Sequence, residues 1–449
     1  MIAYIDEFKT NVTWLPQIPA HWELKKIDAL FTERKTKVSD KDYAPLSVTK
    51  KGILPQLGYA AKSSDRDNRK LVKIGDFVIN SRSDRKGSCG ISKFTGSVSL
   101  INIVLTPRSE LNNDFIHYLL RNYHFSEEYY RNGRGIVADL WTTRYSEMKT
   151  ILLPIPPRKE QDQIVRFLNW KVSKINKLIS IRRREIQELE ELKRSRISSL
   201  VMGQSYKNQK CTDIRWVFSI PKVWNEKPLV QFAYEQSVKN TGMIEENLLS
   251  LSHGKIIKKN INTTDGLLPV SFEGYQIVNA GNIILRLTDL QNDHNSLRTG
   301  LVTQRGIITP AYTCLKVRKG IIPEYLQLQL HVADLCKFFY GMGGGVRQSI
   351  GFKDIKRMLI AIPPINEQNE ILMQVHEVNA PIDKQICRFK TIISELIELK
   401  NTIIANVVTG KIDIRNVAVP EYEHVDILTD EDIEGSDEAI ESQTDGTAE

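Results

Sequence analysis

The sequence has 449 residues, which is too long for one hydrophobic core, and its 41% hydrophobic content is enough for about two to four folded domains. The formal net charge of +8 hides an asymmetry, because the chain from Pro420 onward holds twelve Asp and Glu and no Lys or Arg. Residues 1–419 therefore carry a charge of +20, which favours a polyanionic partner such as nucleic acid over a generically basic surface.

The cysteines and the apolar runs exclude several classes of protein. The five cysteines form no CxxC pair, and no histidine stands at zinc-ligand spacing, so we expect neither a metal site nor a disulfide framework. No apolar run approaches the roughly 20 residues of a membrane span. The first residues, MIAYIDEFK, lack the pattern of a signal peptide. We therefore expect a cytoplasmic protein.

Two motifs occur twice along the chain. The stretch WLPQIPAHW, from Trp14 to Trp22, is repeated as WVFSIPKVW from Trp216 to Trp224. The stretch LPIPPRKEQDQI, from Leu153, is repeated as AIPPINEQNEI from Ala361. From Ile155 and Ile362, where this Pro-Pro box begins, the two copies align without a gap as far as a glycine, with 18 identities in 49 positions. The sequence therefore predicts two homologous halves with fixed ends and variable middles.

The variable middle of each half predicts an α+β domain. Short β-branched runs are bounded by Gly, Pro, Asn and Ser, as strands are, and they cover Phe77–Asn80, Val98–Leu105, Asn282–Leu287 and Gly306–Thr309. A short helix is expected after the strands of each half, at Asp114–Asn122 and Pro323–Leu335.

A long helix is expected after each Pro-Pro box. Apolar residues there recur at spacings of four and three, which is typical of a coiled-coil seam. The predicted seam residues are Ile175, Ile179, Ile186, Leu189, Ile382, Ile386, Phe389, Ile393 and Leu396. Gly203 and Gly410 are expected as C-caps, and Pro381 as a kink or restart. Two separate amphipathic helices are the alternative, but the stripes are too long and narrow for that. The two helices could pair parallel or antiparallel, and two-fold symmetry favours the antiparallel pair.

Polar side chains that can read bases gather in two loops of each half. Arginine pairs with guanine, and asparagine or glutamine with adenine, in the major groove. For any single residue a solvated surface role is the simpler interpretation, but the clusters occur at matching places in both halves. The candidate DNA-binding residues are Asn80, Arg82, Arg85, Lys86, Arg134, Arg144, Arg286, Asn292, Asn295, Arg298, Arg347 and Gln348.

Signatures of catalysis are missing from the sequence. The glycines of GMGGG, from Gly341, lack the Lys-Ser/Thr of a P-loop, and no GxGxxG opens a helix. No Asn-Pro-Pro-aromatic or Asp-Pro-Pro-aromatic tetrad of amino-methyltransferases occurs, nor does HExxH. We expect no catalytic residue, no metal and no cofactor held by this chain. The Pro-Pro box is interpreted as the start of a helix, with Glu160 or Glu367 in its first turn.

The doubled pattern resembles the specificity subunits of type I restriction-modification enzymes. The resemblance covers residues 14–412 and implies two target-recognition domains that each read one half of a bipartite asymmetric DNA site. It implies that the paired helices set the spacer and bind two methyltransferase subunits, which would direct adenine methylation, with endonuclease subunits completing the complex. It places S-adenosylmethionine, ATP and Mg on those partner subunits.

The predicted organisation follows the motifs. Target-recognition domains are expected at 1–157 and 206–364, coiled-coil helices at 158–205 and 365–412, and an acidic, disordered tail at 413–449. The alternative function is a coiled-coil scaffold with two protein-interaction domains and no role on DNA. The +20 charge of residues 1–419 argues against that alternative.

Overall fold

The computed structural model describes residues 3–56, 67–108, 111–135, 141–261, 271–290, 297–342 and 349–425. Its contacts divide the chain into two compact units. The first unit joins the chain up to Arg183 with the segment that starts at Phe389, and the second unit holds Arg184–Arg388. Each unit thus contains half of each long helix, whereas the sequence predicts that each helix is one undivided segment.

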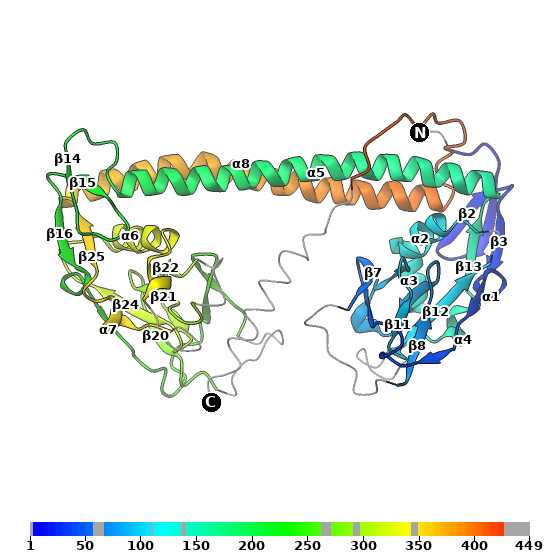
Figure 1. The fold of residues 1–449 in the computed structure, drawn as a ribbon, viewed down its shortest axis with the longest axis horizontal. Helices are drawn as coiled ribbons and strands as arrows, with labels where there is room; N and C mark the ends of the chain where they lie inside the picture. Colours follow the sequence, from blue (N-terminus) through cyan, green and yellow to red (C-terminus); the bar gives the residue numbers. More distant parts are fainter. Residues whose placement is uncertain are drawn as a thin grey trace. The chain divides into compact units, whose positions relative to one another are not determined.

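The first unit is an α+β domain built from small antiparallel sheets (Figure 1). Its central sheet has the order β10-β9-β12-β4, and all four residues of β9 are buried because neighbouring strands and helices cover both of its faces. The smaller sheets are β11-β8-β5, β1-β2, β13-β3 and β6-β7. The elements are β1 Glu7–Val12, β2 Leu15–Pro19, β3 Glu23–Lys26, α1 Ile27–Leu30, β4 Phe31–Glu33, β5 Lys37–Val38, β6 Leu46–Thr49, β7 Gly52–Pro55, β8 Arg69–Val72, β9 Phe77–Asn80, η1 Ser83–Arg85, β10 Cys89–Ile91, β11 Gly96–Val98, β12 Asn102–Pro107, α2 Asn113–Arg121, α3 Tyr123–Arg131, α4 Tyr145–Met148 and β13 Leu152–Ile155.

The second unit repeats this topology. Its central sheet, β17-β24-β21-β22, corresponds strand for strand to β4-β12-β9-β10, and the pairs β14-β15, β16-β25, β18-β19 and β20-β23 have counterparts in the first unit. The predicted pair of homologous α+β domains is confirmed. The elements are β14 Gln209–Cys211, β15 Ser219–Pro221, β16 Asn225–Pro228, η3 Leu229–Gln231, β17 Ala233–Glu235, β18 Leu249–Ser252, β19 Lys255–Lys258, β20 Gln276–Val278, β21 Ile283–Leu285, β22 Thr299–Leu301, β23 Gly306–Ile308, β24 Thr313–Val317, α6 Pro323–Leu335, η4 Phe338–Gly341, α7 Phe352–Ile355 and β25 Leu359–Ile362.

The two long helices, α5 (Arg158–Val201) and α8 (Ile365–Val408), pair antiparallel. In the first unit the red-orange end of α8 lies beside the first turns of α5 (Figure 1), and the Arg182 guanidinium lies 5.1 Å from the centre of the Phe389 ring. In the second unit Lys193 forms an ion pair of 2.5 Å with Asp383. The predicted seam residues are all buried or half-buried.

The ends of the long helices follow one pattern. Gly203 and Gly410 have φ of 65° and 76°, and each donates its N–H to the carbonyl three residues back. The next residue donates to the carbonyl five back, from Gln204 to Ser199 and from Lys411 to Asn406. These are Schellman motifs, so the predicted C-caps are confirmed. Helix α8 runs without interruption through Pro381, so the expected restart there is absent; one missing N–H leaves the neighbouring turns bonded.

The glutamine of each Pro-Pro box ties the long helix to the adjacent domain. Gln161 donates to the Pro156 carbonyl at 2.9 Å and accepts from the N–H of Asn112, the N-cap of α2, at 2.9 Å. Gln368 donates to Pro363 at 3.0 Å and accepts from the N–H of the α6 N-cap residue at 2.9 Å. Both glutamines are buried. The box thus positions a short helix as well as starting a long one.

The glutamate of each box accepts from the tryptophan that ends the other repeated motif. Trp22 Nε1 donates to Glu160 at 3.1 Å, and Trp224 Nε1 donates to Glu367 at 2.9 Å. The Tyr4 hydroxyl also donates to Glu160, at 2.5 Å. In the second half Tyr206 bonds to Glu367 as Tyr4 bonds to Glu160. Burial and this hydrogen bond raise the pKa of the Tyr206 hydroxyl to about 12.

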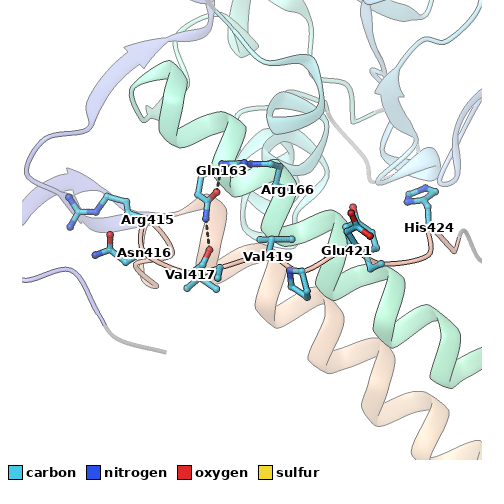
Figure 2. A pocket seen from close by; sticks show the side chains of 11 residues that line it. Gln163, Arg166, Arg415, Asn416, Val417, Val419, Glu421 and His424 are labelled. Carbon is cyan, nitrogen blue, oxygen red and sulfur yellow. Dashed lines mark hydrogen bonds between the residues drawn. The ribbon is translucent and has the colours of Figure 1, made fainter.

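The segment after α8 lies against α5 (Figure 2). Gln163 Nε2 donates to the carbonyl oxygens of Ile414 and Val417 at 3.2 and 2.8 Å, and Asn176 Nδ2 donates to the Val425 carbonyl at 2.8 Å. The prediction of a disordered tail from residue 413 is therefore wrong for residues 413–425, because buried Ile414 and these bonds hold them on α5. Residues 426–449 lie outside the described residues.

Candidate nucleic-acid interface

The structure joins the two predicted recognition loops of the first unit. One loop follows β9 and holds Arg82, and the other follows α3 and holds Arg134. Both arginines form backbone β-bridges with Thr142. The Arg134 and Thr142 backbones exchange two hydrogen bonds of 2.9 Å, and Thr143 N–H donates to the Ser81 carbonyl, also at 2.9 Å. Two segments that are distant in sequence thus form one surface.

Five of the candidate side chains on this surface are exposed, namely Arg82, Arg85, Lys86, Arg134 and Arg144. Their ion pairs are peripheral: Arg85 lies 3.7 Å from Asp84, Arg134 lies 4.0 Å from Glu147, and Lys86 pairs with Glu127. Exposed pairs of this kind contribute little stability. An approaching phosphate can therefore replace the carboxylate partners at low cost, and the five cations suit a polyanionic ligand.

Tyr129, Tyr130 and Trp141 hold the two loops through hydrogen bonds to backbone carbonyls. The Tyr130 hydroxyl donates to the Arg82 carbonyl at 3.1 Å, and Tyr129, which is 1% exposed, donates to the Thr143 carbonyl at 3.0 Å. Trp141 Nε1 donates to the Tyr130 carbonyl at 2.9 Å. These bonds hold the backbone of both loops and leave the arginine side chains free to project. Neither these aromatic residues nor Thr142 was singled out from sequence, since their partners are distant in the chain.

The second unit holds its loops together in the same way. Ile350 N–H donates to the Leu287 carbonyl at 3.0 Å, which corresponds to the bond from Thr143 to Ser81 in the first unit. The flanks of the two loops are therefore adjacent in both units. The predicted contacts Asn292, Asn295, Arg347 and Gln348 lie outside the described residues.

Three predicted contacts are buried, and the structure corrects their assignment. Arg298 is 0% exposed, and its guanidinium donates to Tyr340 Oη at 2.9 Å and to the Arg286 and Thr288 carbonyls at 3.2 and 2.7 Å. Arg286 is 4% exposed. Asn80 is 7% exposed, and its side chain accepts from the Arg82 N–H at 3.0 Å. All three side chains are buried and so are not placed to reach a base, and the bonds of Arg298 and Asn80 brace the backbone of the loops.

The described residues contain few other features of a chemical site. A cavity of about 890 Å³ lies between the start of α5 and the C-terminal segment, lined in part by Gln163, Arg166 and His424 (Figure 2). Within the described ranges, no group of three or more His, Cys, Asp or Glu is placed to hold a metal ion. In the same ranges no helix is both long enough and apolar enough to cross a membrane.

The fold and the joined loops define a two-domain protein built around an antiparallel helix pair. Residues 19–191 match the family described as the type I restriction modification DNA specificity domain. Over these residues the chain is similar to the DNA specificity domain of type I restriction-modification systems.

Two known proteins are similar to this chain over most of its length. The putative type I restriction enzyme MjaX specificity subunit of Methanocaldococcus jannaschii is 22% identical over 441 residues, covering 92% of this chain and 99% of that protein. A chain from a structure of complex assembly and conformational transition in the type I R-M system aligns with a TM-score of 0.59. It is 12% identical and covers 88% of this chain and 99% of its own, so it shares the fold.

Proposed function

We propose that this chain reads DNA for a type I restriction-modification complex, with each α+β domain recognising one half of a bipartite asymmetric site in double-stranded DNA. The observation that carries the proposal is the joining of two arginine-bearing loops into one exposed basic surface in the first unit. The matching backbone bond in the second unit supports a second reading surface built the same way.

In the first domain the proposed contacts are Arg82, Arg85, Lys86, Arg134 and Arg144. An arginine can donate two hydrogen bonds to guanine O6 and N7, whereas a lysine binds phosphate as a point charge. Asn292, Asn295, Arg347 and Gln348 remain proposals for the second domain by their place in the sequence. The domains differ at these positions, so we expect two half-sites of different sequence.

The helix pair is proposed to set the distance between half-sites and to bind two methyltransferase subunits. Rigid helices hold a fixed spacing in the way that dimer geometry fixes half-site separation. Endonuclease subunits would complete the complex, and S-adenosylmethionine, ATP and Mg would be held by the partners. This chain would then act in the cytoplasm without catalysing a reaction itself, directing adenine methylation and restriction.

The test is base-resolution mapping of methylated DNA from cells that express the methyltransferase subunit with and without this chain. A bipartite motif that depends on this chain is expected, and replacing residues 1–157 with those of another specificity subunit should change one half of it. A soluble complex with an active methyltransferase but no motif would contradict the proposal and favour the scaffold.

A further inference from the structure

The hairpin of β18 and β19 is a short two-stranded ribbon in the second unit. Leu249 pairs with Lys258 and Ser252 with Lys255, in register throughout. The turn residues His253 and Gly254 have φ of 45° and 74°, as a type I′ turn requires, so the ribbon closes tightly.

The hairpin carries unopposed positive charge. Lys255, Lys258 and Lys259 are all exposed, and the sequence from 249 to 261 has no Asp or Glu. In the part of the chain that the structure describes, none of the three ammonium groups has an ion-pair partner. Ile257, between them on β19, is 41% exposed. Three unpaired cations on one ribbon fit an extended anionic ligand better than a single carboxylate.

The hairpin packs against β22 and the residues just before it, which follow the candidate recognition loop of its unit in sequence. A Cβ at Gly254 would lie 3.2 Å from Leu297 Cβ, and one at Gly300 would lie 2.6 Å from Leu251 Cδ1. Residues 297 to 301 lead into and form β22, directly after the segment that contains the predicted contacts Asn292 and Asn295. The ribbon is thus held against the strand that follows this loop.

The first unit has the same arrangement. Its β6-β7 hairpin carries Lys50 and Lys51 at the tip. A Cβ at Gly90, on the strand that follows the Arg82 loop, would lie 3.1 Å from Gly52 Cα. A basic hairpin beside a recognition loop therefore occurs twice, although the two hairpins share little sequence.

We propose that the β18-β19 hairpin binds the DNA phosphate backbone next to the half-site read by the second domain. The proposal rests on the proposed DNA function and adds to it a surface outside the recognition loops. Contacts from lysine to phosphate position a protein on the duplex and carry no sequence information. The hairpin would therefore add affinity for any sequence and hold the neighbouring loop in register with its bases.

The test compares the full-length chain with the variant Lys255→Ala/Lys258→Ala/Lys259→Ala. Binding to a fluorescent duplex of mixed sequence is measured by anisotropy across a salt series. Each phosphate contact contributes about 0.9 to the slope of log affinity against log salt, so the variant should lose about 2–3 units of slope. The matched control, Lys222→Ala/Lys227→Ala/Lys319→Ala, removes three other exposed lysines of the second unit and should keep the wild-type slope.

A second readout does not depend on substitution. The duplex should protect Lys255, Lys258 and Lys259 of the wild-type chain from acetylation, while Lys222 and Lys319 stay reactive. The hairpin proposal would be overturned if DNA binding by wild type and variant depended equally steeply on salt and if the duplex did not protect the hairpin lysines from acetylation. The DNA function would still stand in that case. A wild-type chain without salt-dependent binding would overturn the DNA function itself.

Discussion

Trp224 Nε1 donates to Glu367 Oε1 at 2.9 Å across 143 residues of sequence, and Trp22 repeats this bond to Glu160 at 3.1 Å across 138. The two motifs that occur twice in the chain are therefore one structural junction, made twice. At each junction the long helix of one half ends beside the tryptophan of the other half. Gly203 lies against Trp224 and Gly410 against Trp22.

The first prediction concerns the acceptor at this junction. Glu367→Ala leaves the buried Trp224 N–H without a partner, so we expect the free energy of unfolding to fall by about 1–3 kcal/mol. Glu160→Ala should cost more, because Glu160 also accepts from Tyr4 and lies 2.8 Å from His21 Nε2. Urea unfolding followed by tryptophan fluorescence measures both. The control Glu→Gln variants keep an oxygen acceptor and should lose less; equal losses for Ala and Gln would contradict the prediction.

The second prediction separates strain from a clash at the end of α8. Gly410 and Gly242 have nearly equal φ, 76° and 77°. A Cβ at Gly410 would lie 2.3 Å from Pro19 Cδ, whereas one at Gly242 would meet nothing within 4 Å. Both alanine variants should lose about 1 kcal/mol to backbone strain. Gly410→Ala should lose a further 1–3 kcal/mol, roughly, to overpacking. Similar unfolding midpoints for the two variants would show that the junction relaxes around the methyl group.

The third prediction is a loss of stability in mild acid. His117 is half-buried beside Arg121, and desolvation first, then the Arg121 charge, lowers the pKa of its imidazole to about 3. The unfolded chain binds a proton at His117 near pH 6.5, whereas the native protein does not. The contribution of neutral His117 to the free energy of unfolding is therefore complete above pH 6.5 and is lost as pH falls toward 3.

The expected slope from His117 is about 1.4 kcal/mol per pH unit below pH 6. The measurement is urea unfolding of the wild type and of His117→Gln at several pH values between about 7.5 and 5. The difference in unfolding free energy between the two proteins should shift in favour of the variant as pH falls. A difference that does not change with pH would mean that His117 has the same pKa in the native protein as in the unfolded chain.

The fourth prediction contrasts an exposed with a buried arginine. Arg82 is exposed, so Arg82→Ala should leave stability within about 0.5 kcal/mol of wild type while weakening recognition of the first half-site by about 1–3 kcal/mol. Arg298→Ala should instead destabilise the second unit, because it leaves buried carbonyl oxygens unpaired. Thermal unfolding and methylation mapping distinguish the two. Equal loss at both half-sites for Arg82→Ala would contradict its assignment to one domain.

Periodicity and repetition predicted the large features of this chain. The 4-3 stripe of seam residues predicted the long helices, and Gly203 and Gly410 predicted their ends, because capping is a local property of the backbone. The hydrogen-bond partners of Glu160 could not be predicted. Its sequence context indicates a helix start, and the tryptophan and tyrosine that bond to it come from the distant beginning of the chain.

The sequence by itself determined the doubled α+β architecture, the two helices and the strongly basic body, since hydrophobic pattern, glycine position and charge are carried by neighbouring residues. Only the tertiary structure decided which cations face solvent. Arg82 and Arg298 are the same residue type in matching loops, yet one projects from the surface and the other donates to carbonyls inside. Burial depends on which distant segments pack over a side chain, and no local pattern encodes that.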